Sequence, residues 1–413
     1  MRLTYTYINV SYNQGRRGSD MIFVIGSIFP ENLDDYFSEM YYKSKPDVSS
    51  LVYGRKLLKG FKTLTAESEL VVFSVPHVGL YPLQSKRNWV DFKTTDSIYR
   101  PIKYRSAFFL KHHSQFKYLK KALKTELATL PANLEVTFVV TEAYWPYLRA
   151  IKSLKNVRQK TRICVIVPDV PEFVGSPKRS LLLRLAKRVY VRQTYSLLDS
   201  VANSYILFSP AMAKNPHFGS KPHFVSLGSS EMRQTKVSAR LPKRAVFIGK
   251  LEEMNCIKTI LDAMGLIKDP GMELYIAGSG PLENKVSAAA QSDRRIHYLG
   301  FVNPDKAQSL LLSASCILCL RKPDDFSAYS FPSKLTSALE IDCPVISYEL
   351  PTFDENLKKC VLIPKDQSPS SLAETISLAF KNTEINKEAR NAFLKTVNNV
   401  ELAKRIISND FNC

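Results

Sequence analysis

The sequence predicts an α/β protein with two Rossmann-like domains that face each other across a cleft. Its 413 residues are too many for one ordinary hydrophobic core. Strand-like apolar runs alternate with helical segments, which is typical of a parallel sheet covered by helices. The same alternation begins again after residue 240. We therefore expect a second sheet of the same kind, with ligands bound beyond the carboxyl ends of the strands.

The expected strands are short apolar runs bounded by Gly, Pro or polar residues. In the first half they cover residues 21–30, 70–76, 135–141, 162–168 and 204–209. In the second half they cover residues 245–251, 272–281, 296–302, 316–322 and 343–349. Helices are expected between several of them, and two terminal helices at 368–380 and 386–408.

These patterns divide the chain into four parts. Residues 1–20 are polar and show no clear period, so we expect an extension with little fixed structure. Residues 21–235 form the first Rossmann-like domain and residues 241–385 the second. Residues 386–413 are expected to form a helix that packs back towards the first domain.

The net charge of +20 is placed unevenly. Residues 1–240 hold 37 Lys and Arg against 17 Asp and Glu, whereas residues 241–413 hold 21 of each. The first half is therefore expected to face an anionic partner. Residues 103–124 and 178–192 mix basic and apolar side chains, which predicts amphipathic helices on an anionic membrane surface. The alternative is a solvated basic face above a buried apolar stripe.

Seven cysteines are scattered along the chain, which indicates a reducing compartment and no disulfide framework. Cys316 and Cys319 have metal-ligand spacing but lie in the apolar run "ASCILCL", so we interpret them as buried thiols and expect no metal site. Apolar runs stop near ten residues, well short of a membrane span.

The stretch "YSFPSKLTSALEIDCPVI" predicts an anion-binding helix start. Pro332 suits the first turn of a helix, because its missing N–H needs no partner there, and Ser330 is a candidate N-cap. Lys334 is unfavourable beside the positive end of the helix dipole unless an anion lies between them. A solvated surface lysine is the alternative interpretation.

Two further loops at strand ends favour a phosphate ligand. Gly249 and Lys250 follow one strand, and Gly278 and Gly280 follow the next. Glycines there let the backbone approach a ligand closely. The dinucleotide motif GxGxxG is absent, which argues against NAD. These features together indicate a nucleotide diphosphate.

In this order and spacing, "IGK", "AGSGP", "LGFV" and "YSFPSKLTSALEIDCPVI" resemble the nucleotide-sugar domain of glycosyltransferase family four. "VIGS" and "VPDVPE" also resemble a bacterial branch that builds surface polysaccharides. The resemblance implies the GT-B architecture, a nucleotide-diphosphate sugar as donor, retention of anomeric configuration, and no cofactor or required metal. It further implies a saccharide acceptor that is often lipid-linked, and a cytoplasmic protein peripheral to the plasma membrane.

The resemblance carries over residue by residue in the second domain. It implies a diphosphate contact for Ser333 and Lys334, a phosphate loop at Gly249 and Lys250, and main-chain packing beside the base at Phe301. Asp325 stands where the branch has a Glu near the donor sugar. Both Glu of the Glu-x7-Glu pair are replaced here, by Tyr329 and Ser337, and Glu340 is a candidate substitute for the second. Together with Gly278, Ser330 and Glu340, these residues form the expected donor site, with Asp325 and Lys334 as its catalytic residues.

The first domain is expected to supply the acceptor side. Gly26 and Ser27 follow the first strand and are expected to face the donor. Glu142, Tyr144 and Asp169 follow later strands and are candidates for acceptor contacts.

Two other functions remain open at this stage. The missing Glu pair is compatible with a non-catalytic binder of sugar nucleotides. The charge of +20 is compatible with nucleic-acid binding, although aromatic recognition motifs are absent and the phosphate loops would be unexplained.

Overall fold

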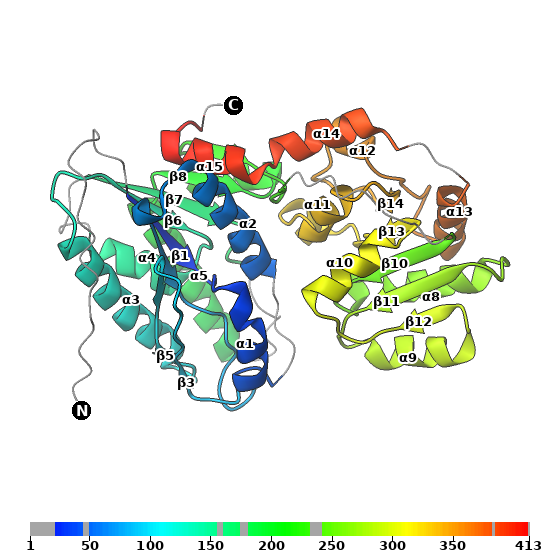
Figure 1. Ribbon diagram of the computed structural model, residues 1–413, viewed down its shortest axis with the longest axis horizontal. Helices are drawn as coiled ribbons and strands as arrows, with labels where there is room; N and C mark the ends of the chain where they lie inside the picture. The colour runs from blue at the N-terminus through cyan, green and yellow to red at the C-terminus, as the bar shows by residue number, and fades with distance from the viewer. Residues whose placement is uncertain are drawn as a thin grey trace.

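A computed structural model describes residues 21–43, 49–154, 160–173, 181–231, 242–381 and 385–411. Within these residues the chain forms two α/β domains side by side (Figure 1). The expected extension at 1–20 lies outside the described residues.

The first domain is built on a seven-stranded parallel sheet in the order β4-β2-β1-β6-β7-β8-β9. The strands are β1 (Met21–Gly26), β2 (Leu70–Ser74), β4 (Tyr99–Pro101), β6 (Val136–Val140), β7 (Thr161–Val167), β8 (Ser204–Leu207) and β9 (His223–Val225). The helices are α1 (Asp34–Met40), α2 (Ser49–Leu64), α3 (Lys111–Ala128), α4 (Trp145–Lys152), α5 (Leu181–Val201), α6 (Pro210–Ala213) and α7 (Pro216–Gly219). A short antiparallel ribbon joins β3 (Trp89–Val90) to β5 (Tyr104–Arg105).

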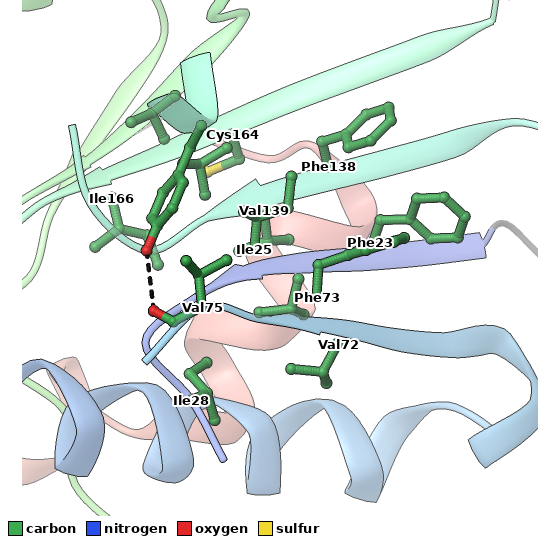
Figure 2. Packing of buried hydrophobic residues seen from close by; sticks show 14 of the residues in the cluster. Phe23, Ile25, Ile28, Val72, Phe73, Val75, Phe138, Val139, Cys164 and Ile166 are labelled. Carbon is green, nitrogen blue, oxygen red and sulfur yellow. Dashed lines mark hydrogen bonds between the residues drawn. The ribbon is translucent and has the colours of Figure 1, made fainter. Parts of the chain in front are cut away.

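The central strands of this sheet read as continuous apolar runs because helices cover both faces. Every residue of β1, β2 and β6 is buried. Figure 2 shows Phe23, Phe73 and Phe138 from these strands packed beside one another. The buried hydroxyl group of Tyr147 donates a hydrogen bond to the carbonyl oxygen of Val75.

The second domain has a five-stranded parallel sheet in the order β12-β11-β10-β13-β14. Its strands are β10 (Arg244–Ile248), β11 (Glu273–Ala277), β12 (Ile296–Tyr298), β13 (Cys316–Leu318) and β14 (Val345–Ile346). Its helices are α8 (Ile257–Leu266), α9 (Glu283–Ser292), α10 (Pro304–Leu312), α11 (Ser333–Leu339), α12 (Glu355–Lys358) and α13 (Pro369–Ala379). This is the doubly wound order. β11 and β12 follow on one side of β10, and β13 and β14 follow on its other side, so the order of the strands reverses between β10 and β13.

The last two helices connect the domains. α14 (Lys387–Thr396) packs on α12 and α11 of the second domain, whereas α15 (Asn399–Ser408) packs along α2 of the first. Figure 1 shows this red segment crossing from one domain to the other. The side-chain amide of Asn399 donates to the carbonyl oxygen of Lys56, which ties α15 to α2.

Four expectations about elements can be compared with the structure. The strand predictions in both halves are confirmed, and Cys316 and Cys319 are buried as expected. A helix over the whole of 103–124 is wrong: residues 104–105 form β5, and α3 begins only at Lys111. Phe109, two residues before that start, has a φ of 62°, which interrupts a helical path. Of the second basic segment, residues 178–180 lie outside the described residues and the remainder belongs to α5.

Candidate functional site

The carboxyl edge of the first sheet faces the second domain. Phe173, beyond β7, contacts Phe326 edge to face, with ring centroids 4.9 Å apart. Ser209, beyond β8, donates from its hydroxyl group to the carbonyl oxygen of Ala328 at 2.5 Å. Phe326 and Ala328 belong to the short 3-10 helix η4 (Asp325–Ala328) that follows β13. Because all the strands of the first sheet are parallel, their carboxyl ends share the edge that lies against this part of the second domain.

In the second domain, the loops after β10 and β11 meet the first turn of α11. A methyl group placed on Gly249 would lie 2.4 Å from Nζ of Lys334, so the ammonium group lies directly over this glycine. A methyl group on Gly278 would lie 1.8 Å from the carbonyl oxygen of Gly249. The two loops and the lysine therefore form one compact cradle of backbone and positive charge.

Gly278 also requires a backbone conformation that favours glycine. Its φ is 146°, its N–H donates to the carbonyl oxygen of Gly300 at 2.7 Å, and its own carbonyl accepts from the Tyr298 hydroxyl group at 3.1 Å. A side chain here would clash and strain the backbone at once. The loop after β11 is thereby fixed between its two neighbours.

The start of α11 differs from the expectation. The helix begins at Ser333, and Pro332 is its N-cap residue rather than part of the first turn. No side chain caps it, so the assignment of Ser330 as N-cap is wrong. The physical reason is that the backbone is still extended at Pro332 (ψ 96°), so the helix starts one residue later. Ser330 is instead buried beneath the loop.

Asp325 is the first residue of η4, and its side chain lies outside what the structure describes. The neighbouring Asp324 caps η4, since its carboxylate accepts from the N–H of Ser327 at 2.9 Å. The backbone of Asp325 is therefore held in a defined turn next to the contact with the first domain.

Glu340 is engaged by the first domain. Nζ of Lys56, on α2, lies 3.1 Å from Oε2 of Glu340 and 3.3 Å from Oγ of Ser337. The other carboxylate oxygen accepts from the N–H of Glu231 at 2.8 Å. The side chains of Lys56 and Glu340 are only 14% and 15% exposed. In this structure the carboxylate proposed as a substitute for the missing Glu serves the contact between domains.

Arg321 is a residue that sequence analysis missed. Its guanidinium group lies over the ring of Phe326, with Cζ 4.9 Å from the centroid. Burial lowers its pKa, while the charges of Asp169, Asp324 and Glu252 act in the opposite direction. The candidate acceptor residue Asp169 therefore faces a cation of the second domain. The sequence signal that pointed to Arg321 was its position at the end of the predicted strand "CILCLRK".

The first domain contributes a polar cluster at its own carboxyl edge. The N–H of His77, after β2, donates to Oγ of Ser27 at 2.8 Å. Nε2 of His77 lies 3.2 Å from Oε2 of Glu142, which follows β6. Tyr144, the N-cap residue of α4, lies beside them, with its ring centroid 5.8 Å from that of His77. Sequence analysis named Ser27, Glu142 and Tyr144 but missed His77, although it stands just beyond the predicted strand "LVVFSVP".

Lys111 and His112 of α3 border this cluster. Burial lowers the pKa of Lys111 to about 8, and the charge of Glu142 partly opposes that shift. The His112 ring lies between Tyr144 and Tyr190, at centroid distances of 5.4 Å and 5.7 Å. Burial also raises the pKa of Tyr144, whose hydroxyl group donates to Oε1 of Gln115. The cluster is therefore bordered by aromatic rings and by the half-buried Lys111.

The other predicted residues lie at strand ends as well. Gly26 ends β1, where a methyl group would lie 2.0 Å from Oγ1 of Thr141. Lys250 is exposed beside Gly249, Ser333 begins α11, and Phe301 is 45% exposed beyond β12. The loops after β10 and β11 thus gather around Lys334, while Gly26, Ser27 and Glu142 gather on the opposite domain.

The described part of the chain contains neither a metal-binding cluster nor a membrane-spanning helix. No group of three or more His, Cys, Asp or Glu residues there is arranged to hold a metal ion. No helix there has the length and apolar character needed to cross a membrane.

Comparisons with known proteins agree with this fold. Several solved structures share the arrangement of both domains. HepE of Anabaena, in a complex with UDP and glucose, has a TM-score of 0.61 at 12% identity, over 95% of this chain and 99% of HepE. Sucrose-phosphate synthase from Thermosynechococcus elongatus has a TM-score of 0.58 at 13% identity, over 95% of both chains. The chain has the GT-B fold.

A third GT-B structure, the trehalose-6-phosphate synthase OtsA, has a TM-score of 0.61 at 10% identity, over 94% of this chain and 98% of OtsA. Residues 242–382 match the family model described as Glycosyl transferases group 1. That match covers the second domain, including the cradle at Gly249, Gly278 and Lys334. No curated protein matches the sequence.

Proposed function

We propose that the protein is a glycosyltransferase that moves a sugar from a nucleotide-diphosphate sugar to a saccharide acceptor. The observation that carries the proposal is the ammonium group of Lys334 over Gly249, where the loops after β10 and β11 meet. This cradle lies at the carboxyl edge of a doubly wound sheet, which is where such sheets bind nucleotides. The family match over residues 242–382 and the GT-B fold support it.

The chemistry follows from where charge develops. When the bond from the sugar to the diphosphate breaks, negative charge grows on the diphosphate. Cations and N–H groups aimed at that charge beforehand stabilise the transition state more than the ground state. In this proposal Lys334, Lys250 and the backbone of Gly249 and Ser333 supply them. Asp325 would hold the hydroxyl groups of the donor sugar or steady the cationic anomeric carbon.

The finer features of the reaction are part of the same proposal. We infer transfer of a hexose with retention of configuration and without a required metal, because Lys334 and Lys250 would supply the positive charge. Proton NMR of the first-formed product reports its anomeric configuration. Turnover that is unchanged by EDTA supports the metal-free step, and loss of turnover that Mg²⁺ restores contradicts it.

We further propose a lipid-linked acceptor in the assembly of a capsule or exopolysaccharide, with the protein docked on the cytoplasmic face of the plasma membrane. The support is α5. Leu181, Leu185 and Val189 form one stripe and are 70%, 46% and 56% exposed. Arg184 and Arg188 on the neighbouring stripe line an open groove of about 1070 Å³. A helix with exposed apolar and basic stripes is suited to an anionic bilayer surface.

Calorimetric titration of the chain with UDP, GDP and other nucleoside diphosphates tests the donor site. UDP enters the panel first because HepE was solved with it. Saturable binding of one diphosphate, weakened by Lys334→Ala, is the expected result. Absence of binding to every member of the panel would contradict the proposal.

A second candidate is a sugar-nucleotide binder without turnover. The observation that favours it is the contact of Lys56 with both Ser337 and Glu340, which places a cation of the first domain where the resemblance leads us to expect the ribose-binding carboxylate. Release of diphosphate from the corresponding nucleotide sugar distinguishes the two. An enzyme releases it, whereas a binder holds the nucleotide sugar intact.

A further inference from the structure

We propose that His77, positioned by Glu142, accepts the proton of the hydroxyl group that attacks the donor sugar. The proposal rests on the glycosyltransferase function proposed above and assigns a proton acceptor to the first domain. Its basis is the geometry of the polar cluster at the carboxyl edge of the first sheet.

The first argument is position. In the first sheet, β2 and β4 lie on one side of β1, and β6 to β9 lie on its other side. The order of the strands therefore reverses between β1 and β6, and the crevice for ligands opens beyond these two strands. Ser27 follows β1 and Glu142 follows β6. The backbone of His77 is held there by its hydrogen bond to Ser27. His77 therefore lies at the place in this sheet where a ligand is expected.

The second argument is proximity to the donor domain. Gly54 of α2 approaches Ile28, the residue that follows Ser27, so closely that a methyl group would lie 2.5 Å from its side chain. Two residues further along α2, Lys56 contacts Ser337 and Glu340 of α11. The end of β1 is thus linked through α2 to the helix that carries Lys334. His77 lies beside this end of β1 through the hydrogen bond of its N–H to Ser27.

The third argument is the arrangement of the pair. Oε2 of Glu142 lies 3.2 Å from Nε2 of His77, in ion-pair contact, although the two atoms are not aligned as a hydrogen bond in this structure. Glu142 is 15% exposed, and its other oxygen, Oε1, is buried without a hydrogen-bond partner among the described residues. A carboxylate at Nε2 keeps the proton on that nitrogen, which leaves Nδ1 as the basic atom. His77 itself is 36% exposed, so a ligand can reach it.

Tyr144, at the start of α4, packs beside the His77 ring. His112 of α3 lies on Tyr144 and also contacts Tyr190 of α5, and Lys111 of α3 acts electrostatically with Glu142. Glu142 is the only carboxylate that we place against the His77 ring in the described part of the chain.

The step balances as follows. The hydroxyl oxygen of the acceptor forms a bond to the anomeric carbon, and its proton passes to Nδ1 of His77. The bond between the anomeric carbon and the diphosphate oxygen breaks in the same step, on the same face of the sugar, and its electron pair leaves with the diphosphate. Glu142 stabilises the resulting imidazolium ion, and the proton then returns to solvent. Glu142 is a positioning residue in this scheme.

The test uses the full chain and UDP-glucose, with water as the attacking hydroxyl group so that no acceptor is needed. His77→Gln keeps an amide that can donate to Glu142 but removes the basic nitrogen. His297→Gln is the matched control, because His297 pairs with Glu273 at 3.5 Å on the second domain, away from this cluster. We expect His77→Gln to lower kcat for release of UDP at least 30-fold, with the Kd for UDP changed less than twofold and His297→Gln like the wild type.

The dependence of activity on pH is a measurement that a purely structural role of His77 would not change. Loss of activity at acid pH, which reports a base that must be deprotonated, should be present in the wild type and absent in the residual activity of His77→Gln. Glu142→Gln should lower kcat and shift that limb without changing the Kd for UDP.

The outcomes separate this proposal from the one on which it rests. If wild type and His77→Gln bind UDP equally and release it from UDP-glucose at equal rates, His77 is not the proton acceptor while the donor site stands. A wild type that binds UDP without turning over UDP-glucose also overturns the role of His77. A chain that binds none of the nucleoside diphosphates overturns the glycosyltransferase function itself.

Discussion

Lys334 shows at the residue scale how a position that is unfavourable for a helix indicates a ligand. It is the second residue of α11, where a positive charge opposes the helix dipole, and it lies over Gly249. We expect Lys334→Ala to lower kcat/KM about 30-fold, which corresponds to about 2 kcal/mol of lost transition-state stabilisation. Steady-state kinetics with the best-bound nucleotide sugar measure it. Lys395→Ala, at an exposed position of α14, is the control, and equal loss in both would contradict a specific role.

Gly278 and Gly265 form a matched pair for testing the loop after β11. Gly278→Ala should destabilise the second domain by about 2 kcal/mol or more and weaken nucleotide binding, because of its positive φ and the close carbonyl oxygen of Gly249. Gly265, in α8, has no atom within 4 Å of an added methyl group. Gly265→Ala should therefore stabilise the domain by about 0.5–1 kcal/mol. Calorimetric unfolding of both variants measures these changes in stability. A Gly278→Ala variant as stable as the wild type would refute the assigned geometry.

Lys111 allows a prediction about pH. Its pKa is lowered from 10.5 to about 8 by burial, so between these values the folded chain binds fewer protons than the unfolded chain. Stability therefore rises with pH through that window, and the cost of the buried charge is fully present below pH 8. Lys111→Met should raise the melting temperature at pH 7, and the difference from the wild type should narrow as the pH approaches 10.5. A difference that does not change with pH would contradict this account.

At the scale of elements, α5 carries the prediction about membrane docking. Leu181, Leu185 and Val189 together replaced by Ser should abolish co-sedimentation with anionic vesicles, because the apolar stripe would no longer insert. Wild-type binding should weaken as salt rises, since screening shortens the reach of the basic stripe. Leu378→Ser, at a position of α13 that is 54% exposed, is the matched control. Equal binding of the wild type to neutral and anionic vesicles would contradict an electrostatic contribution.

At the scale of the whole molecule, the contact of Lys56 with Ser337 and Glu340 connects the two domains. Lys56→Met would leave a largely buried carboxylate without its cation, at a cost of about 1–3 kcal/mol. Amide hydrogen exchange in α2 and α11 should become about tenfold faster, which corresponds to about 1.4 kcal/mol. Lys358→Ala removes the surface pair with Glu355, which is 81% exposed, and should leave exchange unchanged. Unchanged exchange in Lys56→Met would show that this contact does not hold the domains together.

Much of the fold could be predicted because its signals are local. The strands at 21–26, 70–74 and 273–277 are short apolar runs, and their alternation with helices specifies a parallel sheet. Gly249, Gly278 and Lys334 could be named because glycines and a misplaced lysine at strand and helix ends are readable in the sequence. The short elements between residues 80 and 110 could not, since a positive φ at Phe109 and an antiparallel ribbon have no local signature.

The sequence by itself determined the two-domain α/β architecture, the excess charge of the first half and the residues that gather at Gly249, Gly278 and Lys334. Only the tertiary structure decided which side chains meet across distances of tens to hundreds of residues. It brought His77 to Glu142, placed Arg321 opposite Asp169, and engaged Glu340 with Lys56. The physical reason is that the pattern of a strand or helix is repeated every few residues, whereas a contact between loops depends on strand order and on how the domains pack.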